Sequence, residues 1–240
     1  MKRWNVALYI ILVTLLTGCG PVDSINPLFS DKDVIFDSAL EGGWMAEDGG
    51  LRIARADSHS SQYRILTLNE SGKCDAKADA YAAYLVNLDG HRFLDVVQDI
   101  HPDSSMTNEF HIIHAPSKGG AKDEYKVEPA LSYLGNSMYA DASPAHSDGS
   151  GASFSLRVRQ AHWFLSVHLE NEKLHLAMLD EDWVNKGLQK GSLTIPHALL
   201  GSEHKQLVLT ATTEELQRFV RDHEDDKEAF PPMTEMHRIE

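Results

Sequence analysis

The sequence YLVNLDGHRFL spans residues 84–94 and contains the clearest turn signal in the chain. Asp89-Gly90 near its centre is typical of a two-residue turn that joins two antiparallel strands. A turn of fixed length sets the register of the pairing, so we expect Tyr84 to lie directly opposite Asp95. Both faces of this hairpin carry apolar residues, which indicates a ribbon covered on both sides.

A second hairpin follows later in the chain, with strands at 163–169 and 174–179 joined across 170–173. Apolar and polar residues alternate along the first of these strands, which is the two-residue period of a half-buried strand. Pairing across the turn gives one apolar face and places His168 directly opposite His175 on the other.

These hairpins and the other short alternating runs predict a mostly β chain, an antiparallel barrel or curved sheet of roughly eight strands. Two helices are expected near its end. A short one near 180–188 is capped by Asp180, and a C-terminal one near 213–222 follows the capping box formed by Thr212 and Glu215.

An apolar residue and an aspartate, Phe36 and Asp37, precede a short turn and the sequence Gly42-Gly43-Trp44. This order resembles the entrance of a lipocalin, where a Gly-x-Trp opens the first strand. The spacing from Phe36 to Gly42 is one residue shorter than the usual lipocalin pattern. The resemblance implies a lipocalin-like barrel, which agrees with the strand count.

The N-terminus begins with a basic head at residues 2–3, continues with an apolar run over 6–16 and reaches Leu-Thr-Gly-Cys at 16–19. This order resembles the signal of a bacterial lipoprotein. A transmembrane helix needs about 20 apolar residues, and this run is shorter. The resemblance implies that residues 1–18 are a signal peptide and that Cys19 becomes acylated, which would anchor the chain in a membrane.

The residue after the cysteine bears on which membrane this is. In Gram-negative lipoproteins an aspartate at this place usually retains the protein at the inner membrane, and here the residue is Gly20. By this resemblance we expect the periplasmic side of the outer membrane rather than the inner membrane, if the host is Gram-negative. The segment Asn-Pro-Leu at 26–28 is also similar to one in small bacterial lipoproteins of unassigned function, and it implies no activity.

The sequence then suggests a simple domain organisation. Residues 19–35 contain two prolines and are expected to be the lipidated cysteine and a tether. A single β-rich domain is expected over 36–223, with a flexible loop near 135–151 where Gly, Ser, Ala and Asp dominate. The acidic, proline-containing range 224–240 is expected to be a loosely held tail.

Charge and motif content exclude several classes of function. The chain has 36 acidic and 22 basic residues, a net charge of -14, which disfavours nucleic acid as a partner. Motifs of serine hydrolases, zinc proteases, nucleotide-binding proteins and EF-hands are absent from the sequence. We therefore expect a protein that is not an enzyme and needs no cofactor.

The favoured function is a lipid-anchored protein of the cell envelope that binds a small apolar ligand or lipid in the barrel. Candidate ligand-binding residues are Tyr84, Phe93, Asp95 and Trp163. Asp95 lies between two apolar residues, and inside a barrel it needs a hydrogen-bonding partner.

Two alternatives remain open. In the first, the barrel core is filled, and the protein is a structural or interaction lipoprotein of the envelope. In the second, His168 and His175 bind a metal ion, since directly opposed residues lie within reach of one zinc or copper ion. These two residues would supply only two ligands of the three or four that such a site needs.

Overall fold

The computed structural model describes residues 21–74, 80–98, 130–133, 138–144, 154–200, 206–233 and 235–239. This part of the chain is mostly β, as predicted. The elements are β1 (Asp23–Ser24), β2 (Val34–Ile35), η1 (Ser38–Leu40), β3 (Gly42–Ala46), β4 (Gly49–Arg55), β5 (Gln62–Leu68), β6 (Ala80–Leu88), β7 (His91–Gln98), β8 (Ala130–Tyr133), β9 (Met138–Pro144), β10 (Phe154–Gln160), β11 (His162–Glu170), β12 (Lys173–Met178), α2 (Glu181–Lys190), β13 (His197–Leu200), β14 (Gln206–Leu209), α3 (Thr213–His223) and β15 (Met236–Ile239).

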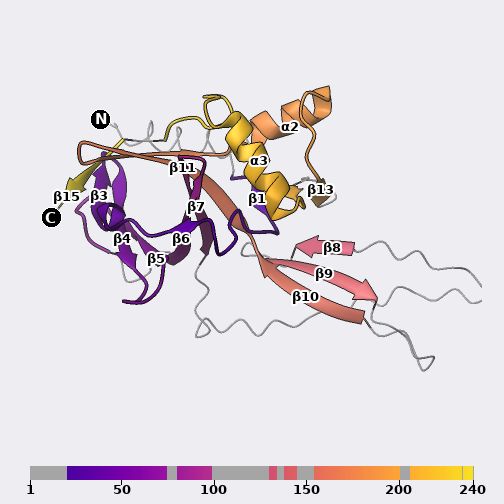
Figure 1. Cartoon of the computed structure of the whole chain (residues 1–240), viewed down its shortest axis with the longest axis horizontal. Helices are drawn as coiled ribbons and strands as arrows, with labels where there is room; N and C mark the ends of the chain where they lie inside the picture. The colour runs from indigo at the N-terminus through magenta and orange to yellow at the C-terminus, as the bar shows by residue number, and fades with distance from the viewer. Residues whose placement is uncertain are drawn as a thin grey trace, which may run out of the picture.

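Eight of these strands close into an antiparallel barrel (Figure 1). Strands β3, β4, β5, β6, β7, β11, β12 and β15 follow one another around it in chain order, and β15 returns to pair with β3. Closure leaves none of these eight strands with an unpaired edge, which removes a common route to aggregation. The result is the lipocalin-like barrel that the sequence predicts.

Both predicted hairpins are confirmed with their registers. Asp89 and Gly90 adopt the positive φ values that a type I′ turn requires, and Tyr84 pairs with Asp95. In the second hairpin a two-residue turn joins β11 to β12, and His168 pairs with His175. The two α-helices are also confirmed, with Asp180 and Thr212 as their N-caps.

The barrel interior forms one hydrophobic core. The residues of this core that are fully or almost fully buried are Leu40, Trp44, Ile53, Tyr63, Ile65, Ala83, Leu85, Leu94, Val96, Val167, Leu174, Leu176 and Met236. Leu40 comes from the short helix η1, which lies ahead of the first barrel strand. The indole N–H of Trp44 donates to the Leu40 carbonyl at 2.9 Å, so the Gly-x-Trp segment and η1 are fixed to each other.

Arg238 of β15 holds the same end of the barrel together. Its guanidinium lies 4.3 Å from the centre of a Trp44 ring, within the range of a cation–π contact. The same group donates to the carbonyls of Ala39 and Glu41, which flank the end of η1. One arginine near the C-terminus therefore connects the closing strand to the entrance of the barrel.

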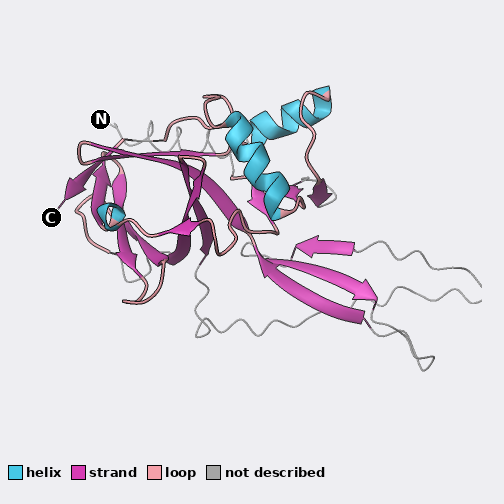
Figure 2. Ribbon diagram, in the orientation of Figure 1, coloured by secondary structure: helices cyan, strands magenta, loops and turns pink. Residues whose placement is uncertain are grey.

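The two helices lie beside the barrel (Figure 2). A second core, formed by residues of the outer wall and of these helices, lies outside the barrel. The outer faces of β6, β7 and β11 contribute Val86, Phe93 and Phe164, and α3 contributes Leu216 and Val220. This explains why both faces of the first hairpin are apolar, because one face lines the barrel interior and the other packs against helices.

Residues 21–35, which we predicted as a tether, pack against this domain. Val22, Ser24 and Leu28 are buried. Strand β1 lies between β11 and β14 and pairs with both, and Pro21 forms a bridge to Asp180. Two prolines suggested an open chain here, but a single short strand and a few buried apolar side chains are enough to fix the segment.

The range 224–240, which we predicted as a loose tail, supplies the eighth strand of the barrel. Phe230 is buried in the outer core, and β15 pairs with both β3 and β12. Strand β15 has only four residues, which is too short for an alternating pattern to indicate a strand from the sequence. Its pairing with β3 and β12 in the closed barrel identifies it.

Residues 138–144 lie within the segment predicted to be a flexible loop and form β9, which pairs with β8 and β10. The rest of 135–151 lies outside the described residues. Strand pairing on both sides outweighs a composition poor in β-forming residues. No helix in the described part of the chain is long and apolar enough to cross a membrane.

Candidate functional site

The barrel interior is closely packed. A cavity large enough for a water molecule would leave exposed surface on the side chains that line it. Trp44, Tyr63 and Leu85, from three different strands, are each 0% exposed. The Tyr63 hydroxyl is also satisfied, because it donates to the Asp37 carbonyl at 3.0 Å, and burial raises its pKa. These three side chains belong to the interior core, and Tyr81, Trp163 and Leu165 pack against the same core while only partly buried.

The four predicted ligand-binding residues do not converge on one face. Tyr84, Phe93 and Asp95 point to the outside of the barrel, since their neighbours in sequence line its interior. Phe93 is buried in the outer core, 6.0 Å from the ring of Phe230. Trp163 lies against the interior core instead, and its indole N–H donates to Asp23.

Asp95 is the most deeply buried of the polar residues on the outer wall, with 1% of its surface exposed. One carboxylate oxygen accepts a hydrogen bond from the Leu28 backbone N–H at 2.6 Å. The other lies 2.7 Å from Nδ1 of His162. Asp95 therefore has two partners on the outer side of the barrel wall. One is the backbone of the N-terminal segment, and the other is the outward-facing side chain of His162 on β11.

His162 lines a groove on the outer wall that has a volume of about 460 Å³. Its lining residues are Ala56, Gln62, Tyr63, Arg64, Ala82, Tyr84, Val97, Gln98, Gln160 and His162. Among the predicted residues only Tyr84 lies in this lining, with Asp95 directly behind His162. The signal that could have revealed the groove is the register, which puts polar side chains of four neighbouring strands on one outer face.

Hydrogen bonds hold several of these groups in place. The amide of Gln62 donates to the Tyr84 hydroxyl at 2.9 Å, and the amide of Gln160 donates to the Gln98 carbonyl at 3.0 Å. The Tyr84 ring packs against Phe29, with 4.3 Å between ring centres. The groove is therefore a structured polar surface, and the described lining includes no serine, threonine or cysteine that could act as a nucleophile.

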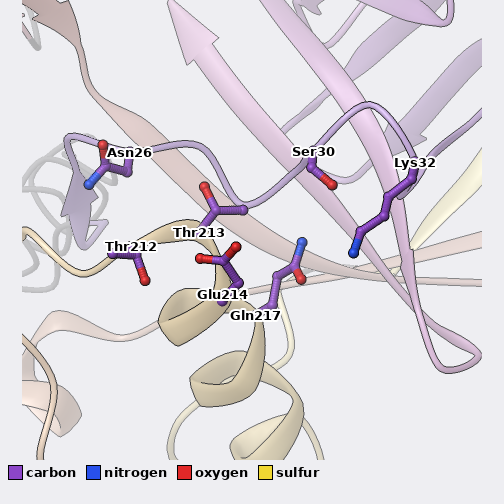
Figure 3. Close-up of a pocket in the computed structure, with 7 residues that line it drawn as sticks. All are labelled: Asn26, Ser30, Lys32, Thr212, Thr213, Glu214 and Gln217. Atoms are coloured by element: carbon purple, nitrogen blue, oxygen red, sulfur yellow. The ribbon is translucent and has the colours of Figure 1, made fainter.

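A second pocket lies at the start of α3 and is shown in Figure 3. Its polar groups serve the fold. Thr212 and Glu215 cap the helix, Thr213 donates to the Pro27 carbonyl, and Gln217 donates to Asp33. These bonds attach the N-terminal segment to α3, and the capping box satisfies the backbone N–H groups of Thr212 and Glu215.

His168 and His175 lie opposite each other on the outer face of the barrel, with 6.1 Å between ring centres. Each is 3.7 Å from a different carboxylate, His168 from Glu170 and His175 from Glu235. A hydrogen bond from Lys173 lowers the pKa of Glu235. In the described part of the chain, no three or more His, Cys, Asp and Glu side chains are arranged to hold a metal ion.

The fold places the chain in the class of lipocalin-like antiparallel β-barrels. Comparisons of the sequence with models of protein families and with curated proteins, and of the structure with solved structures, found no match.

Proposed function

We propose that the protein is a lipid-anchored protein of the bacterial cell envelope whose filled barrel is a scaffold for contacts made at its outer surface. The observation that carries this proposal is the packing of the barrel interior. A lipid-binding barrel needs a cavity, and ligand pockets typically have volumes of about 300–1,000 Å³. Trp44, Tyr63 and Leu85 of the interior core are each 0% exposed, which supports a filled interior.

Lipid anchoring rests on the sequence, since Cys19 lies outside the described residues. A basic head, an apolar run and Leu-Thr-Gly-Cys at 16–19 support acylation of Cys19. In a Gram-negative host, Gly20 supports the outer membrane as the destination. The surplus of acidic residues disfavours direct adsorption to anionic headgroups, so the acyl chains would supply most of the membrane affinity.

Metabolic labelling tests the anchor. We expect the full chain, expressed with its N-terminus intact in a Gram-negative host, to incorporate labelled palmitate. Cys19→Ser should abolish the label, because the hydroxyl of serine does not replace the acylated thiol. Cys74→Ser is the matched control, since Cys74 is the other cysteine of the chain and is exposed. Label that remains in Cys19→Ser and is lost in Cys74→Ser would contradict the proposal.

Native mass spectrometry of the full chain, released from detergent, tests whether the barrel is filled. We expect the mass of the polypeptide and its covalent acyl groups, and no further mass that disappears on denaturation. Incubation with envelope lipids and zinc before the measurement should leave this result unchanged. A bound lipid that is lost on denaturation would instead support the ligand-binding barrel, and a bound zinc ion would direct attention to His168 and His175.

A further inference from the structure

Two aromatic side chains at one end of the interior core are only partly buried. Trp163 of β11 and Tyr81 of β6 pack against this core, and their ring centres are 5.8 Å apart. Leu165, two residues further along β11, is also partly exposed. Deeper residues of the same two strands, Ala83 and Val167, are 0% and 4% exposed. The core therefore reaches the surface at the end of the barrel where β6 and β11 begin.

Trp163 is held at this end by a hydrogen bond to the N-terminal segment. Its indole N–H donates to Oδ1 of Asp23 at 2.5 Å. The other carboxylate oxygen of Asp23 accepts from the side-chain amide of Gln206 at 2.7 Å, and Asp23 is buried. The N–H is the one polar group of an indole ring, so the rest of the Trp163 ring is an apolar surface of fixed orientation.

The position of Asp23 brings this end of the barrel close to the predicted anchor. Asp23 is four residues from Cys19, and four residues of extended chain span at most about 14 Å. The opposite end of β11, at Glu170, lies seven residues beyond Trp163, which is about 23 Å along a strand. With Cys19 acylated, the end that carries Trp163 is therefore the nearer of the two to the lipid.

The chemistry of this end suits the boundary between lipid and water. Trp and Tyr are enriched at the level of the lipid headgroups, because each combines a large apolar ring with a polar group. The helices suit this boundary less well. The Trp183 ring of α2 packs against Phe219 and His223 of α3, and α2 begins with Glu181 and Asp182.

We propose that the protein lies on the bilayer with this end of the barrel toward the lipid, so that Trp163 and Tyr81 enter the headgroup region. The inference rests on the proposed acylation of Cys19, which holds the chain at the membrane. The surface that it fits is zwitterionic, since 36 acidic against 22 basic residues disfavour anionic headgroups. The acyl chains supply most of the affinity, and the two aromatic residues set the orientation of the barrel.

Quenching of tryptophan fluorescence by brominated lipids tests this orientation. The full acylated chain is reconstituted into phosphatidylcholine vesicles whose acyl chains carry bromine close to the headgroups. We expect lower emission than in matched vesicles without bromine, because bromine quenches tryptophans that lie against it. The tryptophans after Cys19 are Trp44, Trp163 and Trp183. Trp163→Phe should lose most of the quenching, and the matched control Trp183→Phe should retain it.

A rescue variant guards against a fold defect in Trp163→Phe, which loses the hydrogen bond to Asp23. Tyr81→Trp added to Trp163→Phe should restore the quenching, because position 81 lies at the same end of the barrel. Circular dichroism of each variant should match that of the unchanged chain. A folded double variant without quenching would contradict the proposal.

Flotation of the same vesicles separates this inference from the anchor itself. A chain that floats with the vesicles but shows no quenching would leave the anchor standing and overturn the orientation. Quenching that is lost in Trp183→Phe and kept in Trp163→Phe would show that the helices face the lipid, which also overturns it. A chain that does not float would overturn the anchor and the orientation together.

Discussion

Trp44→Ala is expected to lower the free energy of unfolding by about 3–5 kcal/mol, which is the usual cost of removing a large aromatic side chain from a packed core. Trp44 is fully buried, donates a hydrogen bond to Leu40 and lies under the guanidinium of Arg238. Its loss opens a cavity and frees both η1 and the closing strand. Urea unfolding followed by circular dichroism measures the change, which is a large part of the stability of a typical domain.

Two further variants make this prediction specific. Trp44→Phe retains most of the buried ring but loses the indole N–H, and should cost about 1–2 kcal/mol. Leu199→Ala removes an exposed apolar side chain and should change stability by less than about 0.5 kcal/mol. A cost of Trp44→Ala close to that of Leu199→Ala would show that the barrel interior is loose and would reopen the question of a ligand cavity.

Asp95→Ala is expected to cost about 2–5 kcal/mol, although Asp95 lies outside the barrel. The substitution leaves the Leu28 backbone N–H and the His162 imidazole without their acceptor. Buried donors without partners are expensive, whereas the methyl group of alanine itself fits easily. The N-terminal segment should also loosen, which limited proteolysis near residue 28 would detect alongside the change in unfolding free energy.

Asp95→Asn separates loss of the acceptor from loss of the charge. Its amide oxygen can still accept one of the two hydrogen bonds, so the variant should lie between Asp95→Ala and the unchanged chain. Asp222→Ala removes an exposed acid from α3 and should shift stability by less than about 0.5 kcal/mol. If Asp95→Ala behaved like Asp222→Ala, the hydrogen bonds of Asp95 would have no role in attaching the N-terminal segment.

Local sequence is enough to predict the two hairpins, their registers and both helix caps. Asp89-Gly90 determines a turn without help from distant residues, and so do Thr212 and Glu215 at the start of α3. The lipocalin-like entrance is also local, because it depends on a short segment around Trp44. These features make the barrel class predictable.

The remaining features depend on contacts between distant parts of the chain. β15 is a strand because β3 and β12 each need a neighbour, and β1 is a strand because it fits between β11 and β14. The site shows the same dependence. The sequence places Tyr84 opposite Asp95, but it does not reveal which face of the hairpin lines the barrel, nor that His162 belongs on the outer face beside them.

If Cys19 is acylated as proposed, the packing of the segment that begins at Pro21 against the domain limits how far the barrel can move from the membrane. Pro21 is two residues from Cys19, and two residues of extended chain span at most about 7 Å. With acyl chains on Cys19, the barrel would lie close to the lipid surface and would have little freedom to rotate relative to it. Partners would be met by lateral diffusion in the plane of the membrane, and only those with a binding surface within the height of one domain above the bilayer could be reached.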